Sequence, residues 1–195
     1  MYLFNARSEG DNNQDNDPRY SGAKGIILKP SFRKPIRSQR CLVIASAFIE
    51  GTTVDGLNKP YLVYLRKRPF AFAGVWDTWV NPESKMAVNS FSIITTTANE
   101  VLQKIPHHRM PIILHHENYS AWLNTSTDLG KVTELLRPYP ASEMNAYPIS
   151  ADIKNPKNNV KELLNPTGER LFPEFEIRVS SELEEKGFGG RKRDD

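Results

Sequence analysis

Short runs of apolar residues, separated by polar turns, organise most of this chain and predict a structure rich in β-strands. The run at residues 41–48 (CLVIASAF) is almost wholly apolar, which favours a strand buried on both faces. Other runs are rich in β-branched and aromatic residues and also favour strands. The predicted strands in this part of the chain are residues 41–48, 61–67, 69–80, 90–97 and 110–114.

The second half of the chain adds helices and one more strand. The predicted helices are residues 99–105, 117–124 and 128–137. Asn124 and Pro138 end the second and third of them. Residues 144–150 predict a last strand, which Pro148 places at the edge of a sheet because proline donates no ladder hydrogen bond. Strands and helices without an internal repeat or a strong linker predict one α+β domain of mainly antiparallel strands.

Two polar segments flank or interrupt the predicted domain. Residues 10–25 are rich in Asn, Asp and Gly, which is typical of a surface loop. Residues 180–195 are polar and charged, so they predict a disordered tail. We therefore expect a single domain over residues 1–179, with the loop inside it and the tail after it.

Composition and charge narrow the class of protein. A chain of 195 residues with 38% hydrophobic and 25% charged residues is long enough to bury a core as one domain. The net charge of +3 permits a nucleic-acid partner without requiring one. The single cysteine excludes an internal disulfide framework and favours a reducing compartment. The absence of a long apolar run or signal peptide predicts a cytoplasmic protein without a membrane partner.

Candidate chemistry gathers between the predicted helix and strand that flank His107 and Arg109. Imidazole can exchange a proton near neutral pH, and guanidinium binds phosphate, although such loop residues are more often simply solvated. Glu50 follows the apolar run at residues 41–48, where burial would raise its pKa, although a glutamate at a strand end is more often exposed. The stretch 30–40 is basic without any acid, so it is either a solvated face or a rim that faces phosphate.

Two pairs of adjacent histidines are candidate metal ligands. The pairs His107/His108 and His115/His116 supply imidazoles, but adjacent histidines point in different directions. No cysteine or convergent acid completes a ligand set in the sequence. We therefore expect neither a metal nor a cofactor.

Six blocks of the sequence, in order, resemble the SOS response-associated peptidase (SRAP) family. The likeness covers nearly all of residues 1–166. The blocks are Asn5-Ala6-Arg7-Ser8-Glu9, residues 40–50 from Arg40-Cys41-Leu42 to Phe48-Ile49-Glu50, residues 70–76 (FAFAGVW), residues 93–111 from Ile93-Ile94-Thr95-Thr96 to Met110-Pro111, Tyr119 with Trp122-Leu123, and residues 147–150 (YPIS).

The resemblance implies a β-barrel-like α+β fold of mainly antiparallel strands with flanking helices. It also implies that the protein senses abasic sites in single-stranded DNA by covalent cross-linking, with autoproteolytic peptidase and lyase chemistry in the family. The family's asparagine, glutamate and histidine match Asn5, Glu50 and His107, which would serve as catalytic residues. The expected DNA contacts, as phosphate clamps or on the basic rim, are Arg7, Arg109, Arg33 and Arg40. We expect the protein to act as a monomer.

The chain departs from the family pattern at its start. Family members carry a cysteine directly after the initiator Met, whose amine and thiol close a thiazolidine on the sugar aldehyde, whereas Tyr2 stands there in this chain. We expect a copy that lacks the family's first strands and its nucleophile. Cys41 cannot replace that nucleophile because its nitrogen lies in a peptide bond. Gly51 stands where many members have a tryptophan. The alternative function is a non-catalytic module that binds single-stranded nucleic acid.

Overall fold

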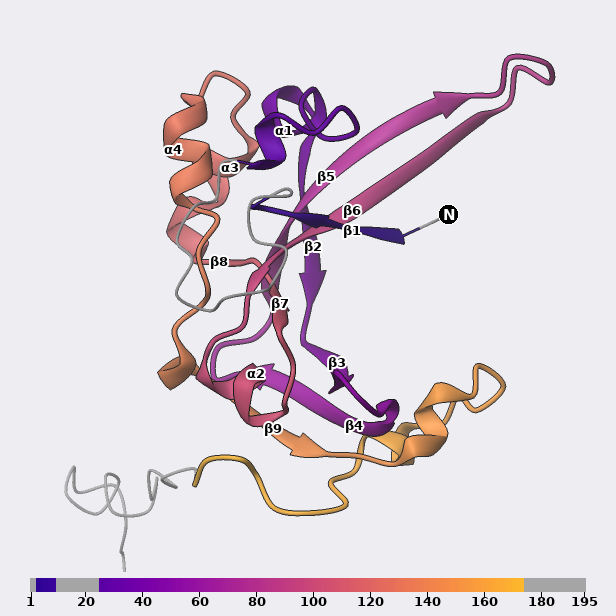
Figure 1. The fold of residues 1–195 in the computed structure, drawn as a ribbon, viewed down its shortest axis with the longest axis vertical. Helices are drawn as coiled ribbons and strands as arrows, with labels where there is room; N and C mark the ends of the chain where they lie inside the picture. Colours follow the sequence, from indigo (N-terminus) through magenta and orange to yellow (C-terminus); the bar gives the residue numbers. More distant parts are fainter. Residues whose placement is uncertain (1–2, 10–24, 174–195) are drawn as a thin grey trace, which may run out of the picture.

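The computed structural model describes residues 3–9 and 25–173, and most of these lie in or between two curled β-sheets (Figure 1). The larger sheet has the strand order β1-β6-β5-β2, with β7 paired to β6 and β8 paired to β5. Its strands pair antiparallel except β1 and β6, which run parallel. The strands are β1 (Leu3–Arg7), β2 (Arg40–Ala45), β5 (Phe70–Val80), β6 (Ala87–Thr97), β7 (Arg109–Pro111) and β8 (Ile113–Leu114).

The smaller sheet has the order β3-β4-β9 and is antiparallel throughout. Its strands are β3 (Ala47–Thr52), β4 (Gly56–Leu65) and β9 (Met144–Pro148). The predicted strand at 41–48 was therefore wrong as one element, because a bend at Ser46 divides it between the two sheets. Burial on both faces was also wrong, since β2 lies at the end of the strand order and Ile44 is 62% exposed. The predicted edge strand near Pro148 is confirmed as β9.

Short helices cover one side of the larger sheet, and short 3-10 turns pack beside the smaller sheet. The predicted helices are confirmed in shorter form: Asn99 caps α2 by accepting from the Leu102 N–H, and Asp128 caps α4 by accepting from the N–H groups of Gly130 and Lys131. The helices are α1 (Pro35–Ser38), α2 (Glu100–Lys104), α3 (Tyr119–Leu123) and α4 (Leu129–Glu134). The 3-10 turns are η1 (Gly25–Ile27), η2 (His116–Asn118), η3 (Ala141–Glu143), η4 (Ala151–Lys154) and η5 (Lys161–Leu164).

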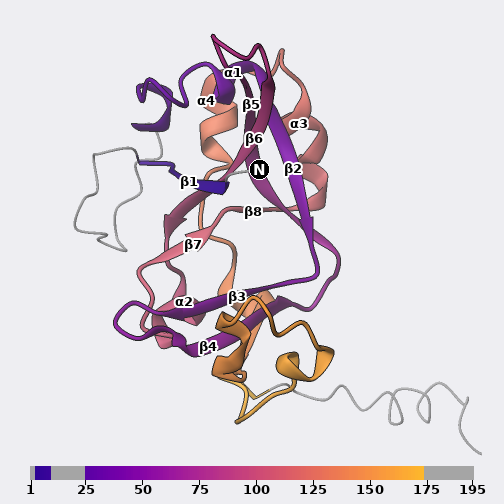
Figure 2. The same cartoon turned by 90° about the vertical axis from the view of Figure 1, so that its right-hand side faces the viewer.

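The two larger of the three apolar clusters among the described residues hold most of these elements together. One joins the larger sheet to α1, α3 and α4 and includes the fully buried Trp122. The other fills the space between the two sheets and α2, and it includes Phe70, Phe72 and Met110. Figure 2 shows α1, α3 and α4 at one end of the molecule and the smaller sheet, with α2 beside it, at the other. The mixed α+β content and the curled, mainly antiparallel sheets confirm the predicted fold class.

Parts of the sequence-based expectation lie outside the described residues. The predicted loop falls mostly on residues 10–24, and the predicted tail falls on residues 180–195, neither of which is described. Within residues 3–9 and 25–173, no helix is long and apolar enough to cross a membrane.

Candidate functional site

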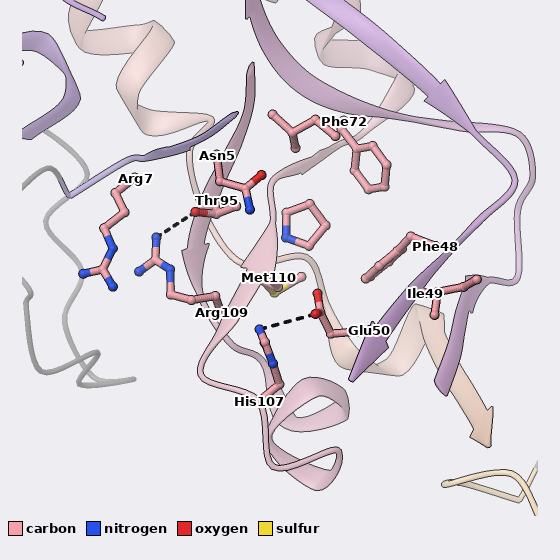
Figure 3. Close-up of a pocket in the computed structure, with 12 residues that line it drawn as sticks. Asn5, Arg7, Phe48, Ile49, Glu50, Phe72, Thr95, His107, Arg109 and Met110 are labelled. Atoms are coloured by element: carbon pink, nitrogen blue, oxygen red, sulfur yellow. Dashed lines mark hydrogen bonds and ion pairs between the residues drawn. The ribbon is translucent and has the colours of Figure 1, made fainter. Parts of the chain in front are cut away.

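A cavity of about 450 Å³ opens where β1, β3, β5, β6 and β7 meet (Figure 3). Of the seven residues that the sequence predicted for the site, five line this cavity: Asn5, Arg7, Glu50, His107 and Arg109. They come from three parts of the chain that lie far apart in sequence. Figure 3 shows the side chains of Asn5, Glu50 and His107 directed toward a common space.

The loop that carries His107 is anchored on both sides by its backbone. The N–H of His107 donates to Leu102 O at the end of α2, and Pro106 O accepts from Thr53 N–H in the turn after β3. The imidazole Nδ1 lies 2.9 Å from Gly51 O. Since a carbonyl oxygen only accepts, Nδ1 carries the proton, and in the neutral ring Nε2 is then a free acceptor.

Glu50 faces that acceptor from β3. Its Oε1 lies 3.6 Å from His107 Nε2, which is close enough for charge coupling but longer than a good hydrogen bond. Burial raises the pKa of Glu50 to about 7, against the opposing hydrogen bond from the Gly51 backbone. Burial also lowers the pKa of His107, with the positive charges of His108 and Arg109 adding to the shift and the bond to Gly51 opposing it.

These opposite shifts make a matched acid and base. Near neutral pH a protonated Glu50 can donate a proton while a neutral His107 Nε2 accepts one, and the pKa of Glu50 then lies close to the pH at which this carboxyl would work. The wall beside them is apolar, because Phe48 and Phe72 meet edge to face with ring centroids 5.6 Å apart. That wall removes water from the Glu50 carboxyl, which is the physical cause of its raised pKa.

Asn5 reaches the cavity from β1. The parallel pairing of β1 with β6 sets Asn5 opposite Ile93, which also lines the cavity. Asn5 is exposed, so its amide can offer both a donor and an acceptor to a bound group.

Glu9 holds Arg109 in place at the cavity, a role that the sequence did not assign. Its carboxylate binds Arg109 in a two-pronged ion pair, with Nη1–Oε1 and Nη2–Oε2 both 2.9 Å. Nη2 of Arg109 also donates to Thr95 Oγ1 at 3.0 Å (Figure 3). Both side chains are largely buried, 14% exposed for Arg109 and 3% for Glu9. The sequence signal for this role of Glu9 is its position in the same family block as Asn5 and Arg7.

Two of the expected DNA contacts lie away from the cavity. Arg40 is 7% exposed, and its guanidinium donates to the backbone carbonyls of Ile36, Arg37, Trp122 and Asn124. These bonds tie α1 to the end of α3 and leave little of the guanidinium for a phosphate. The placement of Arg40 therefore argues against the expected contact. Arg33 is exposed, just before α1.

Gly51 and Cys41 have structural reasons for their identities. A Cβ on Gly51 would lie 2.2 Å from Gly56 O, so the bulge between β3 and β4 leaves no room there for a side chain. Cys41 packs against Gly74 on the neighbouring strand, where a Cβ would meet its Sγ at 2.9 Å. Burial raises the pKa of the Cys41 thiol. Cys41 does not line the cavity, in keeping with a packing residue.

The described residues contain no group of three or more His, Cys, Asp or Glu side chains that could hold a metal ion. His115 instead stacks on Tyr139, with ring centroids 4.6 Å apart, and His116 lies beside Tyr119.

Comparison with known proteins gives this site a context. Abasic site processing protein YoqW of Bacillus subtilis is 43% identical over 145 residues, which cover 73% of this chain and 64% of that protein. Abasic site processing protein HMCES of Pongo abelii is 30% identical over 189 residues, covering 80% of this chain and 52% of HMCES. The chain thus spans less than two thirds of the length of these relatives.

Structure and family comparisons agree with the sequence matches. A crystal structure of a protein from Bacteroides thetaiotaomicron superposes with a TM-score of 0.69 at 31% identity, covering 84% of this chain and 66% of that one. Residues 11–156 match the family model described as SOS response associated peptidase. The resemblance found in the sequence is therefore confirmed, and the chain belongs to the SOS response associated peptidase (SRAP) family.

Proposed function

We propose that this chain recognises abasic sites in single-stranded DNA and holds the baseless sugar in the cavity between Asn5, Glu50 and His107. The observation that carries the proposal is the facing pair of Glu50 and His107, whose pKa values shift in opposite directions in one apolar-walled cavity. The names of YoqW and HMCES as abasic site processing proteins support the choice of substrate.

The arrangement suits the opening of the sugar ring. A neutral Nε2 of His107 can take the proton from the 1′-hydroxyl while the protonated Glu50 gives one to the ring oxygen, which releases the aldehyde. The Asn5 amide can hold the resulting polar oxygen by hydrogen bonds. The same Glu50 can then shuttle protons when an amine adds to the aldehyde.

The covalent step needs an amine and a thiol on adjacent carbons. The family resemblance assigns these groups to a cysteine after the initiator Met, and Cys41 is the one cysteine of this sequence. Cys41 lies outside the cavity and has no free amine. The reaction that the described residues support is therefore ring opening of the sugar, and the amine and thiol for imine formation and thiazolidine closure would come from outside these residues.

Arginine side chains near the cavity are the proposed phosphate contacts. Arg7 lines the cavity itself, and the exposed Arg33 would extend the contact along the DNA. Arg109 is paired with Glu9, so a phosphate would have to replace one carboxylate oxygen to reach it. Binding through such contacts releases counterions, so the affinity should fall steeply with salt. We propose that a monomer makes these contacts.

The test compares single strands that carry a true abasic site, a stable analogue without the aldehyde, or an intact base. Fluorescence anisotropy should show tighter binding of the true abasic site than of the other two. His107→Ala should remove that preference, whereas His108→Ala is the matched control, because His108 is exposed and does not line the cavity. Equal affinity for all three strands would contradict the proposal and favour a non-catalytic module that binds single-stranded nucleic acid.

A further inference from the structure

A second cavity, of about 470 Å³, lies beyond the aromatic wall of the first. Phe72 lines the first cavity and Phe70 lines the second, and their rings meet edge to face with centroids 5.3 Å apart. The volume falls within the range of about 300–1,000 Å³ that small-molecule sites occupy. Its walls combine three kinds of chemistry that the proposed function does not use.

One wall is flat and aromatic. His115 stacks on Tyr139 at an interplanar angle of 27°, and Tyr119 completes the wall from the start of α3. The cavity also has apolar lining residues, which are Ile44, Leu65, Phe70 and Leu114. A cavity lined by an aromatic stack and by aliphatic side chains favours a planar ring, because stacking and burial stabilise such a ring.

Two carboxylates also line this cavity. Tyr139 donates its hydroxyl to Glu143 Oε2 at 3.0 Å, which fixes the carboxylate in place. Oε1 of Glu143 receives no hydrogen bond from the described residues, and Glu117 lines the same cavity. Acceptor oxygens that line a cavity with an aromatic stack suit a ring that carries an amino group.

A basic turn also contributes to the lining of this cavity. Residues 66–68 (RKR) are consecutive and exposed between β4 and β5, and Lys67 lines the cavity. The Arg66 N–H donates to Glu143 O at 3.1 Å, so the turn is fixed beside the carboxylate. A lysine ammonium there can bind a phosphate as a point charge.

We propose that the second cavity binds the amino-bearing base of a nucleotide, with the base against the His115–Tyr139 stack, its amino group at Glu143 and its phosphate at Lys67. Adenine and cytosine each carry an exocyclic amino group, whereas thymine presents only acceptors and a methyl group. The site therefore distinguishes dAMP and dCMP from dTMP. This inference goes beyond the proposed function and requires none of its chemistry.

Calorimetric titration of the whole chain with dAMP, dCMP and dTMP tests the inference. We expect dAMP and dCMP to bind about tenfold more tightly than dTMP, the scale of one hydrogen bond to a charged group. Glu143→Gln should remove that preference, since the amide can still accept from Tyr139 but offers no charge. Lys67→Ala should weaken all three nucleotides about tenfold, whereas the matched control Lys157→Ala, an exposed lysine outside the cavity, should change nothing.

Further titrations show whether the bound base belongs to a free nucleotide or to a DNA strand. They also distinguish binding in the second cavity from binding in the first. Oligonucleotides of dA and of dT distinguish a base within a strand from a free nucleotide, because only the former gains affinity with length. Equal binding of dAMP and dTMP, no binding at millimolar concentration, or equal effects of Lys67→Ala and Lys157→Ala would each overturn the inference. The preference for abasic DNA tests the first cavity separately, because His107 does not line the second.

Discussion

Replacing Glu9 by glutamine tests how the site keeps the buried Arg109 close to His107. Glu9 and Arg109 form a two-pronged ion pair at 2.9 Å, and the side chains are 3% and 14% exposed. Glutamine has nearly the same shape but no charge. Glu9→Gln therefore leaves the guanidinium buried without a counter-ion, while Thr95 still accepts one of its hydrogen bonds.

The expected loss of stability follows from the burial of the pair. Removal of one partner of a buried ion pair costs about 3–5 kcal/mol, because the remaining charge has lost both its partner and water. The glutamine oxygen still accepts one N–H, so we expect Glu9→Gln to lower the free energy of unfolding by about 3 kcal/mol. The charge of Arg109 already lowers the pKa of His107, and without Glu9 that pKa should fall further.

Urea denaturation and NMR titration of the His107 ring measure the two effects. The control is a double-mutant cycle with Arg109→Gln, because the double variant leaves no charge unpaired and should recover part of the lost stability. We expect a coupling energy of about 2 kcal/mol between the two positions. A coupling below about 0.5 kcal/mol, or a rise in the pKa of His107 in Glu9→Gln, would refute the reasoning.

Three further predictions concern other parts of the chain. Folding raises the pKa of Glu50 from 4.5 to about 7, so the free energy of unfolding falls as pH rises through that window. Glu50→Gln should remove this fall and flatten the stability profile between about pH 4.5 and 7. Thermal melts at several pH values check this. Arg40→Ala should lower stability by about 3 kcal/mol, since buried carbonyls lose their donors, yet leave the affinity for single-stranded DNA unchanged in anisotropy. Incubation with abasic DNA should give no heat-stable band on a denaturing gel from the chain beginning Met1-Tyr2, and a stable band once a Met-Cys start is added.

The sequence predicted the elements better than their arrangement. Apolar and β-branched runs located most of the strands, because such runs follow from local burial in a sheet. They could not show that Ser46 turns the chain from one sheet into the other, since both β2 and β3 are apolar. The parallel pairing of β1 with β6 joins residues about ninety positions apart, and no local pattern encodes it.

The sequence also could not show which partners the charged residues of the site have. Asn5, Glu50 and His107 were assigned through family blocks, and the structure places all three at one cavity, where their catalytic roles stay a prediction. Arg40 looked like part of a basic surface because a run of charges reads alike whether a guanidinium faces water or buried carbonyls. Glu9 was missed because its partner lies 100 residues further along the chain.

The Glu9–Arg109 pair also explains how Glu50 can stay protonated beside a guanidinium. An unpaired positive charge at Arg109 would favour the ionised carboxylate and draw the pKa of Glu50 back toward its ordinary value. Glu9 offsets part of the charge of Arg109, and burial is the largest influence on the pKa of Glu50. A DNA phosphate that takes the place of Glu9 on Arg109 brings a similar negative charge. The proposed substrate could therefore bind to Arg109 without changing which of Glu50 and His107 holds the proton.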